Sequence, residues 1–132
     1  MRGLYIWFLR LLLPLVLARL FWRGLSNPDY WKRIKERFGY ITPLSSARVI
    51  WIHAVSVGEV RATAPLVREL KSRYPGYTIL ITTMTPTGSA QVKQLFDDSV
   101  AHCYVPYDFP SAVSRFLDCA RPTLAIIMET EL

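Results

Sequence analysis

The first part of the chain is dominated by one apolar segment. In Leu4–Trp22, sixteen of nineteen positions are apolar, and the three others are Arg10, Pro14 and Arg19. A helix of this length measures about 28 Å, close to the hydrocarbon thickness of a bilayer. Arg19 lies near one end, where its side chain can reach the headgroups. The pattern predicts a membrane-anchoring helix over residues 1–24, which either spans the bilayer or lies at its surface.

A short second helix is predicted directly after the apolar segment. Asn27 can cap this helix, Pro28 suits its first turn, and Gly39 is typical of a helix end. Six basic residues lie at the end of the apolar segment or after it, namely Arg19, Arg23, Lys32, Arg33, Lys35 and Arg37. Positive charge on this side of a membrane helix predicts that the next domain lies in the cytoplasm. Residues 25–47 are therefore predicted to be a basic interfacial helix and linker facing anionic lipids, or otherwise an ordinary solvated helix.

Beyond residue 47, short apolar runs alternate with segments of helical periodicity. Runs without strict alternation indicate strands buried on both faces. Four strands are expected, at Val49–His53, Tyr77–Thr82, His102–Val105 and Leu124–Met128. Three helices are expected between them, within Val60–Tyr74, Gly88–Phe96 and Pro110–Cys119. This order predicts an α/β fold with a parallel, right-handed, doubly wound sheet. Residues 48–132 should form this Rossmann-like domain, and we expect it to be truncated at its C-terminus, because the chain stops in a loop after the last strand.

Composition and charge exclude several classes of protein. With 52% hydrophobic residues, the chain can form a core and is not disordered. The net charge of +6 falls on residues 1–37, which hold eight basic and two acidic residues. The following domain is neutral and lacks the basic face that nucleic-acid binding needs. Cys103 and Cys119 form neither a disulfide scaffold nor a four-ligand metal site, and are expected to be half-buried thiols in a reducing compartment. We predict no metal and no cofactor.

The loop after the first strand contains the strongest candidate for catalysis. In open α/β sheets, ligands bind at the carboxyl ends of the strands, where this loop lies. Ser56 and Glu59 have the spacing of a capping box, in which each side chain bonds the backbone near the other, and Gly58 permits the tight turn. Alternatively, Glu59 is a general base, kept ionised by the helix dipole at the mouth of a cleft. Both interpretations hold if bound substrate or a loop rearrangement frees the carboxylate.

The loop after the second strand is rich in hydroxyl groups and leads into a helix. Its side chains and free amides, at Thr83, Thr85, Thr87 and Gly88, suit either helix capping or the binding of a phosphate. No P-loop pattern accompanies them. His53, which ends the first strand, is interpreted as a core histidine.

Five segments together resemble the 3-deoxy-D-manno-octulosonic acid (Kdo) transferases of Gram-negative bacteria. In chain order they are His53-Ala-Val-Ser-Val-Gly-Glu59, Arg73-Tyr-Pro75, Thr82-Thr-Met-Thr-Pro-Thr-Gly88, Pro106-Tyr-Asp108 and Ile127-Met-Glu-Thr-Glu-Leu132. Each segment alone is a weak signal, whereas their order and spacing make the resemblance specific. It extends over essentially the whole chain.

The resemblance implies a GT-B glycosyltransferase on the cytoplasmic face of the inner membrane, which transfers Kdo from CMP-Kdo to the lipid A precursor. It makes Glu59 the general base and gives Glu129 a role in supporting the transition state. Glu131, Ser56 and Gly58 join the threonine loop as candidate substrate-binding residues. The family's second domain, which supplies most CMP contacts, has no counterpart in these 132 residues, so the chain is expected to be inactive alone. The alternative is a membrane-tethered α/β binding module without catalysis.

Overall fold

The computed structural model describes residues 2–44 and 48–129 of the chain. Helix α1 (Arg2–Ser26) comes first, followed by two short 3₁₀ helices, η1 (Pro28–Tyr30) and η2 (Ile34–Phe38). Strands and helices then alternate, with one more 3₁₀ turn: β1 (Val49–Ala54), α2 (Val57–Arg73), β2 (Thr78–Thr83), α3 (Pro86–Phe96), η3 (Asp97–Ser99), β3 (Ala101–Tyr104), α4 (Pro110–Ala120) and β4 (Pro122–Met128). Each predicted strand is present, with bounds that differ by at most two residues.

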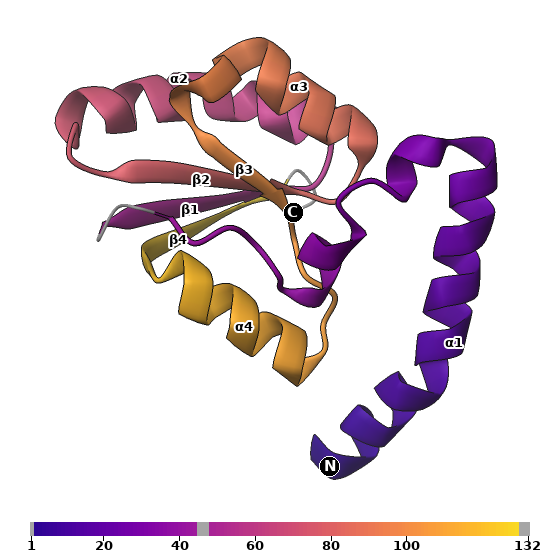
Figure 1. Ribbon diagram of the computed structural model, residues 1–132. Helices are drawn as coiled ribbons and strands as arrows, with labels where there is room; N and C mark the ends of the chain where they lie inside the picture. The colour runs from indigo at the N-terminus through magenta and orange to yellow at the C-terminus, as the bar shows by residue number, and fades with distance from the viewer. Residues whose placement is uncertain (1, 45–47, 130–132) are drawn as a thin grey trace.

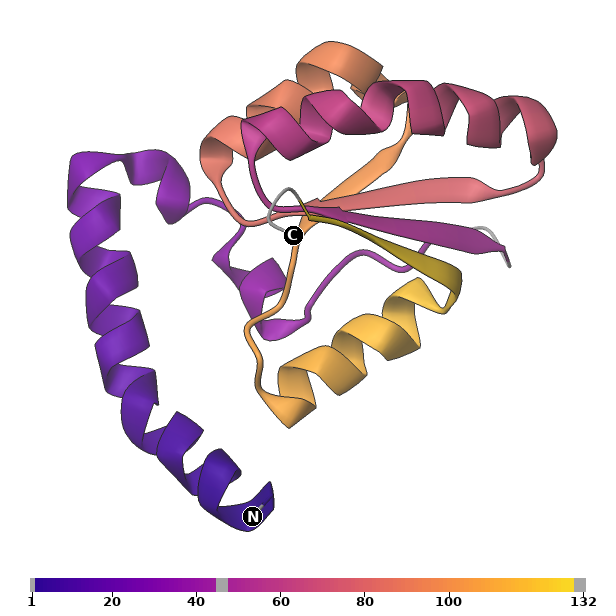
Figure 2. The same cartoon turned by 180° about the vertical axis from the view of Figure 1, so that it is seen from behind.

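The four strands form one parallel sheet in the order β3-β2-β1-β4. Helices α2 and α3 cover one face of this sheet and α4 covers the other (Figure 1). The view from behind shows the same two layers (Figure 2). The parallel α/β fold predicted from the alternating pattern is confirmed, and the parallel direction brings the carboxyl ends of all four strands to one edge.

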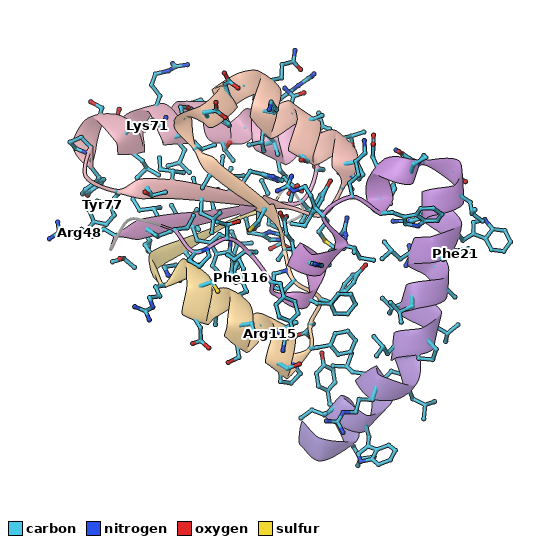
Figure 3. All side chains as sticks on the ribbon, in the orientation of Figure 1. Phe21, Arg48, Lys71, Tyr77, Arg115 and Phe116 are labelled. Carbon is cyan, nitrogen blue, oxygen red and sulfur yellow. The ribbon has the colours of Figure 1, made fainter. Side chains whose placement is uncertain are left out.

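Each face of the sheet buries its own hydrophobic cluster. Toward α2 and α3, Ile52 and Ile81 are fully buried with Val60 of α2. Toward α4, Phe116 packs against the sheet, and its ring centroid lies 5.0 Å from that of Trp51 in an edge-to-face arrangement (Figure 3). Since aromatic pairs of this geometry add to the burial of apolar area, this contact fixes α4 on the sheet.

Helix α1 stands beside the α/β domain, near the edge where the strands end (Figures 1 and 2). Its span Gly3–Ser26 has a mean hydropathy of 1.9 and is long and apolar enough to cross a membrane. Many of its large apolar side chains are exposed, among them Trp7, Leu11, Leu15 and Trp22. The apolar helix expected from the sequence is therefore present, with its apolar surface largely exposed.

The prediction of a single helix after Pro28 is wrong. Asn27 caps the first turn as expected, accepting a hydrogen bond from the Asp29 amide at 3.1 Å. The helix does not continue, because Arg33 adopts the left-handed conformation at φ 58° between η1 and η2. Gly39 ends η2 at φ 85°, which confirms it as a helix end.

Candidate active site

A pocket of about 380 Å³ lies between α1 and the carboxyl edge of the sheet. The loops after β1, β2 and β3 contribute Val55, Met84, Thr85 and Tyr107 to its wall. The opposite wall comes from α1 and the 3₁₀ helices, through Val16, Arg19, Leu20, Arg23, Tyr30 and Arg37. The pocket thus occupies the place where ligands bind in open α/β sheets, and the N-terminal helix completes it.

Glu59 lies in the first turn of α2, and its carboxylate is bonded to Val55 in the loop after β1, which forms part of the pocket wall. Ser56 caps α2, since its hydroxyl accepts from the Glu59 amide at 3.4 Å. In return, Glu59 Oε2 accepts from the Val55 amide at 2.5 Å, one residue earlier than in the usual capping box. Glu59 is only 9% exposed, but its partner Val55 lines the pocket. A carboxylate can accept several hydrogen bonds, so the capping bond leaves Glu59 able to accept a hydrogen bond from a second donor.

The loop after β2 is a helix cap, as one of the two interpretations of its sequence predicted. The Thr85 hydroxyl accepts from the Gly88 amide at 3.1 Å and lies 3.2 Å from the hydroxyl of Thr87. A Cβ added at Gly88 would lie 3.1 Å from that Thr85 hydroxyl and 3.3 Å from the Cβ of Thr83, so a larger residue there would displace these threonines by a few tenths of an ångström. Thr85 lines the pocket.

Thr83 does not fit the role of a substrate-binding residue. Its side chain is fully buried, and its hydroxyl lies 2.9 Å from Nε2 of His102. The hydroxyl is therefore occupied within the fold, and we remove Thr83 from the candidate set. His53, interpreted as a core residue, bonds the Thr82 hydroxyl through Nδ1 at 2.9 Å, and burial lowers its pKa.

The remaining candidate residues lie on the surface or outside the described part of the chain. Ser56, Gly58, Thr87 and Glu129 are exposed, and Glu129 follows β4 at the same carboxyl edge. Glu131 lies outside the described residues. Within residues 2–44 and 48–129, no three His, Cys, Asp or Glu side chains lie together in a group that could hold a metal ion. Cys103 is buried, which raises its pKa to about 12, and Cys119 is half-buried.

One residue of the predicted basic interfacial segment, Arg37, is buried in the protein. This side chain is 3% exposed, and its Nη2 donates to the Met84 carbonyl at 2.9 Å. Its guanidinium also lies over the ring of Tyr104, 4.3 Å from the centroid. The cation is therefore held inside the protein by a carbonyl and an aromatic face, whereas Lys32 and Lys35 of the same segment remain exposed.

Arg33 links the same segment to the sheet. Its guanidinium donates to Glu36 Oε1 at 2.9 Å, to the Ser89 hydroxyl at 3.2 Å and to the His102 carbonyl at 3.0 Å. Glu36 in turn accepts from the Tyr104 amide at 2.8 Å. These bonds fix η2 against β3 and α3, and thereby hold Arg37 at the pocket.

His102 is held neutral between two partners. Its Nδ1 lies 3.1 Å from Arg33 Nη2, and because a guanidinium only donates, Nδ1 is the acceptor and Nε2 donates to Thr83. Burial, followed by the positive charge of Arg33, lowers the pKa of His102 to about 3. Protonation of this ring would place a second cation against Arg33.

We predict that His102 makes the folded protein less stable in acid. The pKa of histidine in the unfolded chain is about 6.5, so between pH 6.5 and about 3 the unfolded state binds a proton that folded His102 does not. The free energy of unfolding should fall by as much as about 3 kcal/mol between pH 7 and pH 4 through this group. Urea unfolding at each pH measures it. His102→Gln should flatten the slope, and an identical slope in the variant would contradict the assignment.

Comparison with known proteins identifies the family. The sequence profile described as 3-Deoxy-D-manno-octulosonic-acid transferase (kdotransferase) matches residues 32–132. The chain belongs to the Kdo transferase family. It is 46% identical over 121 residues to the 3-deoxy-D-manno-octulosonic acid transferase of Haemophilus influenzae, covering 90% of this chain and 28% of that protein. It is 36% identical over 140 residues to the transferase of Bordetella pertussis, covering 99% of this chain and 32% of that protein.

The similarity extends beyond bacteria. A protein of Arabidopsis thaliana, named as a probable mitochondrial 3-deoxy-D-manno-octulosonic acid transferase, is 38% identical over 122 residues, covering 90% of this chain and 27% of that protein. No solved structure matches the chain significantly. The chain spans about 30% of the length of these Kdo transferases, so they contain much more sequence than the α/β unit described above.

Sequence reasoning missed the cationic side of the pocket. The concentration of positive charge in residues 1–37 was visible, but it was attributed to headgroup contacts. The structure adds that Arg19, Arg23 and Arg37 line one pocket together with Tyr107. Burial raises the pKa of Tyr107, and the positive charges of these three arginines oppose that shift. Only the packing of α1 beside the sheet brings these groups together, and no local sequence pattern encodes that packing.

Proposed function

We propose that this chain is the acceptor-binding part of a glycosyltransferase that transfers Kdo from CMP-Kdo to the lipid A precursor. Family membership supports the reaction class. The observation that carries the proposal is the position of Glu59, whose carboxylate is bonded to a backbone amide of the wall of a pocket between the sheet and an apolar helix. A base at that place can act on a hydroxyl group presented by a lipid.

The chemistry requires one proton acceptor at the sugar hydroxyl. As the acceptor oxygen bonds to the anomeric carbon of Kdo, Glu59 takes the hydroxyl proton. The bond between that carbon and the phosphate oxygen breaks, and its electron pair leaves on that oxygen as CMP is released. General base catalysis of this kind contributes roughly 10²–10⁴ in rate. Glu129, at the carboxyl edge beside β1, is proposed to support the transition state. A further domain in a GT-B arrangement would supply the contacts to CMP, and the reaction needs no cofactor.

We propose that α1 attaches the chain to the cytoplasmic face of the inner membrane, and its contacts with the domain bear on how it does so. The Tyr5 hydroxyl donates to the carboxylate of Asp108, so the start of α1 also contacts the domain. A second pocket, of about 330 Å³, is lined by Leu9 and Leu13 of α1 and by Arg115 of α4. A spanning helix with these contacts would draw Asp108 and Arg115 into hydrocarbon, which is costly. We therefore favour a helix that lies along the membrane surface with its outward apolar side chains in the lipid.

Charges placed on the outward side of α1 should release the chain from membranes. Leu11 and Leu15 are 70% and 64% exposed and contribute little to the fold. Each lysine of the double variant Leu11→Lys/Leu15→Lys should cost up to about 2.5–3.5 kcal/mol of membrane affinity, the upper value being that of the bilayer centre. The variant should move from the pellet to the supernatant in vesicle sedimentation. Leu95→Lys/Leu117→Lys adds the same charge elsewhere on the surface and should still sediment. Unchanged sedimentation of the α1 variant would contradict this placement.

A binding module without catalysis is the second candidate, and one observation favours it. Glu59 already has a structural role, because it bonds the Val55 amide and its own amide is bound by the Ser56 cap. In that case the pocket binds a lipid and Glu59 only ends the loop. The two candidates differ in whether a complete enzyme carrying this segment transfers sugar.

A chimera tests the proposed function. The 132 residues replace the matching segment of the Haemophilus influenzae transferase, and the purified chimera is assayed for transfer from CMP-Kdo to lipid A precursor. We expect transfer within about tenfold of the parent enzyme. A chimera that has the circular dichroism and thermal stability of the parent but no transfer would refute the enzymatic proposal and leave the binding module.

A further inference from the structure

Three arginines converge on the pocket without an acidic partner. Arg19 and Arg23 come from α1, and Arg37 comes from η2. None of the pocket's lining residues is acidic. Among the described residues, the ion pairs are formed by other arginines and by lysine, at Lys32–Asp29, Arg33–Glu36 and Arg73–Glu69. The pocket therefore collects positive charge that no carboxylate of the described chain neutralises.

Arg37 provides a second, independent sign of a ligand. Its Nε is buried and has no hydrogen-bond partner, and it is the one such side-chain atom among the described residues. A buried donor left without a partner costs about 1–3 kcal/mol, more when it is charged, so proteins rarely keep one without a purpose. Arg37 lines the pocket, so a shift of its side chain toward a ligand bound there would bring this donor to an acceptor atom.

Much of the rest of the pocket wall is apolar. Val16 and Leu20 line it from α1, and Val55 and Met84 line it from the sheet edge. A fully hydrated anion gains nothing from such walls, whereas an amphiphile places its anionic group among the guanidinium groups and its apolar part against the valine and leucine side chains. The pocket also lies at the C-terminal end of the apolar stretch of α1, where a surface-bound helix meets the headgroups.

We propose that Arg19, Arg23 and Arg37 form a binding site for the phosphate ester of a membrane lipid. A phosphate monoester has three terminal oxygens and two negative charges, which match several guanidinium donors. The site lies beside Val55, the residue whose amide binds Glu59. This inference rests on the proposed function for its consequence: a phosphate held here would place the sugar of a phosphorylated glycolipid next to the general base.

Vesicle binding by the 132-residue chain tests the site without any requirement for catalysis. Vesicles of phosphatidylcholine with 10 mol% phosphatidic acid are compared with vesicles that carry the same surface charge as oleate. The wild-type chain should bind the phosphatidic acid vesicles at least about tenfold more tightly, because charge-assisted bonds to phosphate add to the non-specific attraction. The absence of this preference would overturn the proposal.

Matched variants locate the site. Arg19→Gln/Arg23→Gln should abolish the preference, whereas Arg10→Gln/Lys32→Gln removes equal charge outside the pocket and should keep it. Both pairs are exposed, so the fold should survive in each. Arg37→Lys keeps the charge but loses the donor geometry, and should weaken the preference several-fold. If the Arg19/Arg23 variant retains the preference, or the control pair loses it equally, the site is not this pocket.

One further experiment distinguishes a lipid ligand from a free phosphate. Glycerol phosphate at 10 mM is added to the phosphatidic acid vesicles. Under our proposal it displaces less than half of the bound chain, because it lacks the apolar part that contacts Val16 and Leu20. Complete displacement would assign the site to a soluble phosphate and overturn the assignment to a lipid. The preference is measured without CMP-Kdo, so its loss is distinguishable from an inactive chimera.

Discussion

Replacing Glu59 by Gln in the chimera is expected to lower kcat for Kdo transfer by roughly 10²–10⁴, with little change in KM. The amide is isosteric with the carboxylate, and its oxygen can still accept from the Val55 amide, so the loop and the pocket should remain intact. What the variant loses is the capacity to take the hydroxyl proton. The measurement is steady-state transfer from CMP-Kdo, with urea unfolding as the check on stability.

Ser56→Ala is the matched control for this prediction. It removes the hydroxyl that caps α2 and should cost about 0.5–2 kcal/mol of stability, while lowering transfer far less than Glu59→Gln because the general base remains. The two variants therefore separate the two roles of the loop: one lowers activity and the other lowers stability. More than a tenth of the activity remaining in Glu59→Gln, with unchanged stability, would show that Glu59 is a helix cap and not the base.

Phe116→Ala is expected to destabilise the domain by about 3–5 kcal/mol. Phe116 is fully buried and joins α4 to the sheet through its contact with Trp51, and no other large side chain of α4 is buried as deeply among the described residues. Truncation to alanine removes this contact and leaves a cavity that the surrounding strands cannot fill. Urea unfolding followed by far-ultraviolet circular dichroism measures the change, with an unchanged m-value.

The next residue of α4 supplies the control for the core. Leu117 is 40% exposed, so Leu117→Ala should cost less than about 1 kcal/mol. Similar losses in the two variants would mean that α4 does not pack on the sheet in the way described.

Much of the fold was predictable because its signals are local. Short apolar runs such as Val49–His53 specify buried strands, and Thr85 before Pro86 specifies the start of α3. The region between residues 27 and 39 was not predictable in the same way. Asn27, Pro28 and Gly39 all act as expected, but the left-handed Arg33 is stabilised by Ser89 and His102, which are distant in the sequence.

The same distinction between local signals and distant contacts applies to the candidate site. The capping spacing and position after a buried strand were enough to single out Glu59, and the structure shows its bond to the pocket wall. Thr83 was misjudged, because its partner His102 belongs to a strand nineteen residues away. The sequence shows that the arginines of the pocket belong to a basic segment. That they line one pocket depends on how α1 lies against the sheet edge. Tertiary contacts decide such placements, and local propensity carries no information on them.

Photocrosslinking of the acceptor tests the central claim most directly. That claim is that the lipid acceptor lies in the pocket between α1 and the sheet edge. A benzoyl-phenylalanine is placed at Met84, which lines the pocket and is 41% exposed, and in a second protein at Leu95 on α3, which is 42% exposed and outside it. Irradiation in vesicles that contain labelled lipid A precursor should label the chain through position 84 and leave position 95 unlabelled. Equal labelling at both positions, or none at position 84, would contradict the account.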